Sequence, residues 1–193
     1  YQRKTPSAKN KYAGAIYYTM SEDDGLTWNT PQYLHSDTTH GIGRSFFDIC
    51  TLPNGEIGAI WLDGRKKQRN GSTLCFAQTI KGKGFGQDKE IGQKTCQCCR
   101  TDIFVDQNSI INIAYRDIIN DSIRDIVHVT SADLGETFTE PALISSDNWV
   151  INGCPHTGPS MTNGNSGLQF FWYTMGGNQA VYQTTLTDNI FKP

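Results

Sequence analysis

The sequence SEDDGLTW at residues 21–28 recurs as SADLGETF at residues 131–138. Both copies read S-x-D-x-G-x-T-aromatic, and in both a proline follows three residues after the aromatic residue. A weaker copy has Gly82 and Phe85 at the glycine and aromatic positions, and a fainter one ends at residues 191–193. The aromatic positions 28, 85, 138 and 191 are 57, 53 and 53 residues apart. A unit of about 50 residues therefore repeats along the chain.

The chemistry of this eight-residue box predicts a tight turn. The Asp carboxylate and the Ser and Thr hydroxyls accept hydrogen bonds from nearby backbone N–H groups. The glycine supplies a positive φ at which other side chains clash, and the aromatic residue is left to pack between sheets. We interpret each box as a structural clasp on a hairpin, so the acidic pair Asp23-Asp24 is given no catalytic role.

Short strand-like runs surround the boxes. The runs that lead into them are 14–20, 73–78, 126–130 and 180–184. Before these come pairs of runs joined by a short turn, at 46–52 with 56–62, 103–106 with 109–115, and 159–162 with 167–173. A further run follows the first three boxes, at 32–35, 89–91 and 142–145. Asn54-Gly55, in the first turn, is a strong hairpin signal. Four short antiparallel strands per repeat are typical of a β-propeller blade, so the sequence predicts an all-β propeller.

We expect a single domain over residues 1–193, with blades that end near residues 35, 91 and 146 and a last blade that is incomplete at 193. The chain then holds about three to four four-stranded antiparallel blades, whereas a closed propeller takes about 4–8. It is expected to be a partial propeller, and the remaining blades would belong to a longer parent chain.

The composition argues against nucleic acid and membranes as binding partners. The formal net charge is −2, so no basic field points to nucleic acid or to an anionic membrane surface. The hydrophobic content is 37%, without the run of about 18 apolar residues that a membrane-spanning helix needs. No cofactor is predicted.

Strand alternation predicts which face carries chemistry. With the strands of a blade named A to D from the axis outward, the D–A and B–C loops lie on one face, here called the entry face. Arginines suited to capture of a carboxylate by their planar fork fall in these loops, at Arg65, Arg100, Arg116 and Arg124. His156 and Tyr173 join them as candidate substrate-binding residues, and Asp63 and Asp117 are the candidate catalytic acid or base. The alternative is a solvated face with surface ion pairs of little energetic weight.

Six cysteines leave three interpretations open. They are Cys50, Cys75, Cys96, Cys98, Cys99 and Cys154. The group at 96–99 precedes one inner strand and Cys154 precedes the next, so a disulfide between them is the first alternative. The C-x-x-C spacing of Cys96 and Cys99, with His156 nearby, makes a thiolate/imidazole metal site the second. Inert thiols are the third. No residue is assigned as a metal ligand from sequence.

Several stretches resemble a known family. The boxes are similar to the Asp boxes of sialidases and related BNR-repeat propellers. WLDGR at 61–65, TCQCCRT at 95–101, YRD at 115–117 and the segment 147–158 resemble a bacterial exo-α-sialidase-like group. The resemblance implies a retaining glycosidase that holds a sialic acid carboxylate with arginines and uses an Asp as acid/base. The Arg-Ile-Pro motif that supplies the family's first arginine is absent.

The sequence therefore predicts a sialidase-like glycoside hydrolase propeller that acts on a glycan or a small acidic sugar. A non-catalytic propeller that binds glycans or proteins with the same face is the alternative. The resemblance and the possible disulfide favour an extracytoplasmic location, either secreted or periplasmic.

Overall fold

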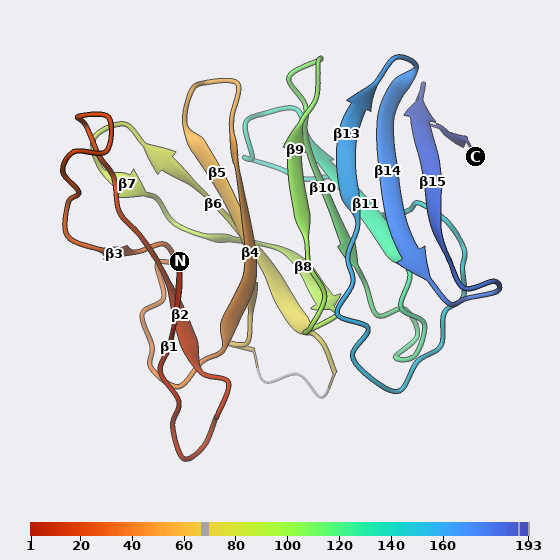
Figure 1. Cartoon of the computed structure of the whole chain (residues 1–193), viewed down its shortest axis with the longest axis horizontal. Helices are drawn as coiled ribbons and strands as arrows, with labels where there is room; N and C mark the ends of the chain where they lie inside the picture. Colours follow the sequence, from red (N-terminus) through yellow and green to blue (C-terminus); the bar gives the residue numbers. More distant parts are fainter. Residues whose placement is uncertain (67–69, 189, 193) are drawn as a thin grey trace.

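The computed structural model describes residues 1–66, 70–188 and 190–192. Within these ranges all regular structure is β-strand. The described residues contain no helix that is long and apolar enough to cross a membrane. The strands form four antiparallel sheets that follow one another in chain order across the molecule, with the two termini at opposite ends (Figure 1).

Each sheet corresponds to one repeat, and we number them blades 1 to 4. Blade 1 consists of β1 (Gln2–Lys4), β2 (Gly14–Tyr18) and β3 (Gln32–Tyr33). Blade 2 consists of β4 (Arg44–Thr51), β5 (Ile57–Asp63), β6 (Ser72–Ile80), β7 (Gly84–Phe85) and β8 (Lys89–Thr95). Blade 3 consists of β9 (Asp102–Val105), β10 (Ile111–Arg116), β11 (Ile126–Ser131) and β12 (Ala142–Leu143). Blade 4 consists of β13 (Ser160–Gly164), β14 (Gly167–Thr174), β15 (Ala180–Thr187) and β16 (Ile190–Lys192).

The predicted all-β architecture of about three to four antiparallel blades is confirmed. Strands β4, β9 and β13 are the inner strands of blades 2 to 4, and β9 contacts both of the others. Strand β8 continues to Thr95, beyond the predicted run, because Gly92 and Thr95 still pair with β6. The predicted blade ends stay predictions, and Pro193 of the faintest repeat lies outside the described residues.

The two full boxes make the same hydrogen bonds, as their chemistry predicts. In the first, the Gly25 N–H donates to Ser21 Oγ over 2.8 Å, and Thr27 donates to Asp23 from both its N–H and its hydroxyl. In the second, the corresponding bonds join Gly135 to Ser131 and Thr137 to Asp133. These bonds hold the pKa of Asp23 at about 2, so this carboxylate is committed to its turn.

The aromatic residues of the repeats hold neighbouring blades together. Phe85 of blade 2 packs on Tyr18 of β2 with ring centroids 5.0 Å apart. Phe138 of blade 3 packs on Phe76 of β6 at 5.2 Å, and Phe191 of blade 4 lies 6.0 Å from His128 of β11. Each therefore contacts the strand that leads into the box of the preceding blade. Trp28 occupies the same position in blade 1 and is 63% exposed.

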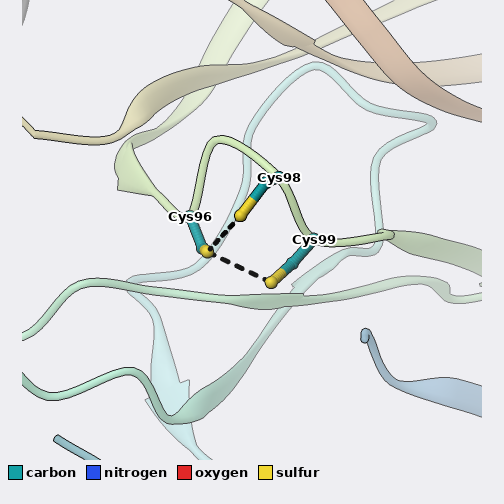
Figure 2. A group of neighbouring side chains, drawn as sticks. All are labelled: Cys96, Cys98 and Cys99. Carbon is teal, nitrogen blue, oxygen red and sulfur yellow. Dashed lines mark hydrogen bonds between the residues drawn. The ribbon is translucent and has the colours of Figure 1, made fainter. Parts of the chain in front are cut away.

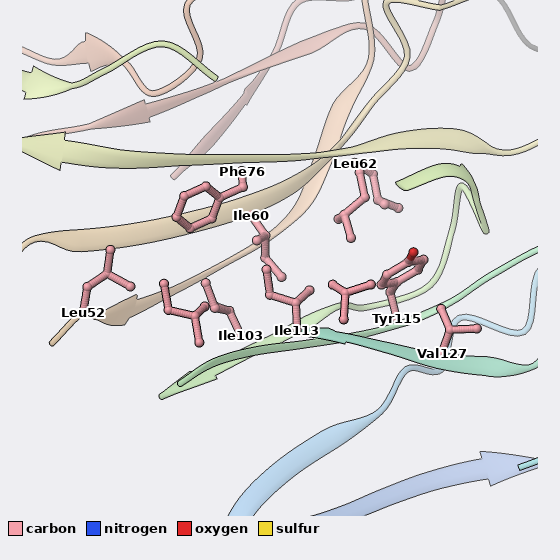
Figure 3. Close-up of a cluster of buried hydrophobic side chains, with 11 residues drawn as sticks. Leu52, Ile60, Leu62, Phe76, Ile103, Ile113, Tyr115 and Val127 are labelled. Atoms are coloured by element: carbon pink, nitrogen blue, oxygen red, sulfur yellow. The ribbon is translucent and has the colours of Figure 1, made fainter. Parts of the chain in front are cut away.

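The largest buried cluster lies between blades 2 and 3 (Figure 3). Leu52, Ile60 and Phe76 of blade 2 face Ile103 and Ile113 of blade 3 across this interface. All five are at most 3% exposed. Burial between sheets therefore fixes blade 3 against blade 2, and their inner strands come side by side.

Candidate functional site at the inner strands

An open pocket of about 840 Å³ lies where the three inner strands begin. It is lined by Gln2, Phe46, Phe47, Asp48, Arg100, Thr101, Asp102, His156, Thr157, Gly158, Pro159 and Ser160. Gln2 belongs to β1, and the other residues come from the starts of β4, β9 and β13 and from the segments before β9 and β13. The pocket therefore opens on the entry face, and we call it the axial pocket.

Asp48 and Asp102 form the chemical centre of this pocket. The pairing of β4 with β5 shifts register between Ser45 and Asp48, and Phe46 has a φ of 51°. Such a bulge redirects the side chains that follow it. Asp48 thereby reaches blade 3, where its Oδ2 accepts a hydrogen bond from the Ile103 N–H at 3.1 Å. Asp102 repeats the contact one blade further on, because its Oδ2 accepts from the Met161 N–H.

The two carboxyl groups also interact with each other. Burial, reinforced by the charge of Asp48 and a hydrogen bond with it, raises the pKa of Asp102 to about 7. Two neighbouring carboxyl groups cannot both ionise cheaply, so one keeps a proton. The pair can therefore supply one acid near neutral pH.

Arg100 and His156 bring a guanidinium and an imidazole to the same pocket. Both are exposed, and among the described residues Arg100 has no ion pair. The segment that carries His156 packs closely against Arg100, because a Cβ at Gly158 would lie 2.1 Å from the Arg100 carbonyl oxygen. Only glycine allows this approach.

Asp63 and Arg65 lie together, but in a buried ion-pair network. The Asp63 carboxylate accepts from Arg44 Nε at 3.1 Å, from Arg65 at 2.7 Å and from Trp61 Nε1 at 3.1 Å. Arg65 also contacts Asp88. Burial alone would raise the pKa of Asp63, but the hydrogen bonds from Arg65 and Trp61 and the charge of Arg44 lower it. This arrangement suits a structural anion better than a proton donor.

Arg116 and Tyr173 also lie next to each other. Arg116 is fully buried and donates to the carbonyl oxygens of Arg124 at 2.6 Å and Tyr173 at 2.8 Å. Its guanidinium lies 4.8 Å from the centroid of Trp149. Burial lowers the pKa of Arg116. Neither Arg116 nor Arg124 pairs with a carboxylate of the described residues.

Asp117 and Arg124 line two other hollows of the surface. Asp117 lies beside Tyr115 in a pocket of about 540 Å³ between blades 2 and 3, where burial raises its pKa. Arg124 lines an outer pocket of about 870 Å³ with Lys94 and Asp121. The eight predicted residues are thus divided among five places, and only Arg100 and His156 reach the axial pocket. Their proposed roles stay predictions.

All six cysteines are free thiols, so the bridge to Cys154 is not formed. Cys96, Cys98 and Cys99 are buried on one turn beside Arg124, whose Nη1 donates to Cys96 Sγ over 3.3 Å. A hydrogen bond from Cys99 lowers the pKa of Cys96 to about 5 against the effect of burial, and the charge of Arg124 contributes. Burial and a hydrogen bond with Cys154 raise the pKa of Cys98.

Sequence reasoning missed Asp48 and Asp102. A signal for them was present, because both precede an isoleucine near the start of an inner strand in adjacent repeats. The bulge that turns Asp48 toward blade 3 cannot be recognised from the alternation of apolar and polar residues along the strand.

Solved structures with a similar fold include glycoside hydrolases and one protein of unknown function. The chain aligns with the α-L-arabinanase of Penicillium chrysogenum at a TM-score of 0.54 and 16% identity, over 78% of this chain and 48% of that one. A structure described as Hadza microbial sialidase Hz136 aligns at 0.60 and 16%, over 96% and 41%. A protein of unknown function from Dyadobacter fermentans aligns at 0.61 and 16%, over 87% and 44%.

The chain has a partial β-propeller fold. It spans less than half of the length of each of these structures, and identities this low show the fold alone. No protein-family model and no curated protein matches the sequence.

Proposed function

We propose that this propeller is a glycoside hydrolase whose axial pocket binds a glycan and protonates its glycosidic oxygen through Asp102. The observation that carries the proposal is the Asp48–Asp102 pair, which keeps a carboxylic acid protonated up to about neutral pH. General acids in glycosidases need such a raised pKa.

Glycosidases generally use two catalytic carboxyl groups, and the Asp48–Asp102 pair supplies one of them, the general acid. The second carboxylate stands about 5–5.5 Å away in retaining enzymes and about 6.5–9.5 Å away in inverting ones. Asp48 lines the same pocket as Asp102 and raises its pKa. Asp48 therefore acts as the group that keeps Asp102 protonated. We propose that the nucleophile or base comes from further blades of a longer parent chain.

Arg100 supports an acidic sugar as the substrate. Of the four predicted arginines, Arg65 is engaged by carboxylates, and Arg116 and Arg124 are buried against backbone carbonyls. Arg100 is left as the exposed cation at the pocket, where it can form a bidentate pair with a sugar carboxylate. A sialoside is the natural first substrate to test, and an extracytoplasmic location stays a prediction.

A non-catalytic glycan-binding propeller is the second candidate. One observation favours it, because both carboxylates also accept a backbone N–H of the next blade. Such bonds hold the inner strands together. They give the two carboxyl groups a structural role that involves no catalysis.

The test is hydrolysis of fluorogenic α-sialosides and α-L-arabinofuranosides by the full-length protein that contains this chain. We expect Asp102→Asn to lower kcat at least about 100-fold, because general acid catalysis contributes about 10²–10⁴. Arg100→Ala should raise KM for the acidic substrate alone. Glu136→Gln, on an exposed box of blade 3, is the matched control.

Glycan binding with no hydrolysis of any substrate by the wild-type protein would favour the second candidate. Hydrolysis that is unchanged in a folded Asp102→Asn protein would overturn the assignment of the acid. Circular dichroism and the unfolding temperature of each variant separate loss of activity from loss of fold.

A further inference from the structure

Three buried thiols converge on one turn between blades 2 and 3. The turn over residues 96–99 is closed by the Cys99 N–H, which donates to the Cys96 carbonyl oxygen at 3.3 Å. The Sγ atoms of Cys96, Cys98 and Cys99 point toward one another and lie within 4.8 Å of each other (Figure 2). At most 6% of any of the three residues is exposed.

These distances suit a tetrahedral thiolate site. With Zn–S bonds of about 2.3 Å, neighbouring sulfurs in a tetrahedron are about 3.8 Å apart. The separation of Cys96 Sγ from Cys98 Sγ is 3.7 Å. Cys99 Sγ is 3.1 Å from Cys96 Sγ, so a bound ion would move these two apart by a fraction of an ångström. The C-x-x-C spacing of Cys96 and Cys99 is common in zinc sites.

Cys154 supplies a fourth sulfur from a distant part of the chain. It lies on the segment between blades 3 and 4, near enough to Cys98 to raise the pKa of that thiol. Cys154 is exposed, so the side of the cluster that it occupies is accessible to an incoming ion.

Charge balance favours a metal over a disulfide. Arg116 and Arg124 are 0% and 6% exposed, and neither pairs with a carboxylate of the described residues. Arg124 Nη1 donates to Cys96 Sγ, and the charge of Arg116 acts to lower the pKa of Cys99. A buried cation is costly unless a negative charge accompanies it. A disulfide is neutral and leaves both guanidinium groups unbalanced, whereas a zinc ion with four thiolates carries a charge of −2.

We propose that Cys96, Cys98, Cys99 and Cys154 bind one Zn²⁺ ion, with Arg116 and Arg124 as its buried counter-charges. Binding joins Zn²⁺ to four thiolates, and each cysteine that is still a thiol releases its proton to solvent. Neither oxidant nor reductant takes part. The ion ties the turn at 96–99 to the segment before β13, and these two segments also carry Arg100 and His156 to the axial pocket. Zinc binding at these cysteines does not require any activity of the axial pocket.

The test is metal analysis of the protein purified under reducing conditions with added zinc. We expect one zinc per chain by elemental analysis. Replacement by Co²⁺ should give the visible spectrum of a tetrahedral ion and a sulfur-to-cobalt charge-transfer band in the near ultraviolet. Cys96→Ser should abolish stoichiometric binding, and Cys154→Ser should weaken it and reduce the charge-transfer band. Cys50→Ser, a half-buried thiol outside the cluster, should leave both readouts unchanged.

Arg124 is tested as a positioning residue. Loss of an outer partner of a metal site costs about 10–100-fold in affinity, so Arg124→Gln should weaken zinc binding by about that factor, and Arg124→Lys should restore part of it. Because Cys96→Ser and Arg124→Gln alter buried positions, circular dichroism accompanies each, and the exposed Cys154→Ser keeps the test informative if either fails to fold. A folded, reduced wild-type protein that takes up no zinc, or a stoichiometric copper or iron ion in its place, would overturn the proposal.

Discussion

Asp63 and Asp102 are both removed from solvent, yet their surroundings shift their pKa values in opposite directions. Asp63 is surrounded by the guanidinium groups of Arg44 and Arg65, which lower its pKa. Asp102 has a second carboxyl group beside it and is partly buried, which raises its pKa to about 7. The number and sign of the neighbouring charges decide the outcome, and burial alone would raise both values.

The raised pKa of Asp102 predicts a pH dependence of stability. Its folded pKa lies above the unfolded value of about 3.9, so its contribution is present below about pH 4 and is lost as pH rises toward 7. The loss is about 1.4 kcal/mol per pH unit within that window. Urea denaturation should show that the wild type loses more stability between pH 5 and pH 8 than Asp102→Asn does. Equal losses in the two proteins would contradict the shift.

Removal of the Asp63 charge should destabilise the fold directly. Asp63→Asn leaves buried Arg44 with a weaker counter-charge, and breaking a buried pair in this way costs about 3–5 kcal/mol. The exposed pair of Asp121 with Lys94 is the control, and Asp121→Asn should change the unfolding free energy by less than about 0.5 kcal/mol. If Asp63→Asn left the unfolding free energy unchanged, the ion-pair network would not be needed for stability. The catalytic role predicted for Asp63 from sequence would then gain support.

At the scale of elements, the aromatic residue of each repeat joins its blade to the blade before it. Phe138 packs on Phe76 of the preceding blade, whereas Trp28 has no preceding blade among the described residues. Phe138→Ala should therefore cost about 2–3 kcal/mol, somewhat below the cost at a fully buried phenylalanine. Trp28→Ala should cost less than about 0.5 kcal/mol in this chain, although tryptophan is the larger side chain.

Denaturant unfolding of the two variants measures this difference. A large cost at Trp28, or none at Phe138, would contradict the packing rule. If further blades precede this chain in its parent, Trp28→Ala should become as costly as Phe138→Ala there.

The sequence predicted the elements better than it predicted the site. The box at 21–28, its copies and the alternating runs between them depend on local turn chemistry and periodicity, and the sheets follow them closely. The entry face was predicted from strand direction, and Arg100 and His156 do line a pocket there. Their proximity to Asp48 was not predictable, because it depends on a bulge and on contacts between blades far apart in sequence.

For the whole molecule, radial stacking of the sheets brings the starts of β4, β9 and β13 together. Everything proposed for the axial pocket depends on this convergence, since Asp48 and Asp102 belong to different blades. The same stacking places the thiols of residues 96–99 near Cys154. Two chemically distinct centres, one of carboxyl groups and one of thiols, thus depend on one arrangement of sheets.

The most direct test is the pKa of Asp102, measured by NMR titration of its side-chain carboxyl carbon in the wild type and in Asp48→Asn. If the two inner strands lie side by side, the wild-type value should be about 7 and should fall when Asp48 loses its charge. A value near the ordinary 3.9 that does not respond to Asp48→Asn would contradict the arrangement of the blades and the acid proposed for the pocket.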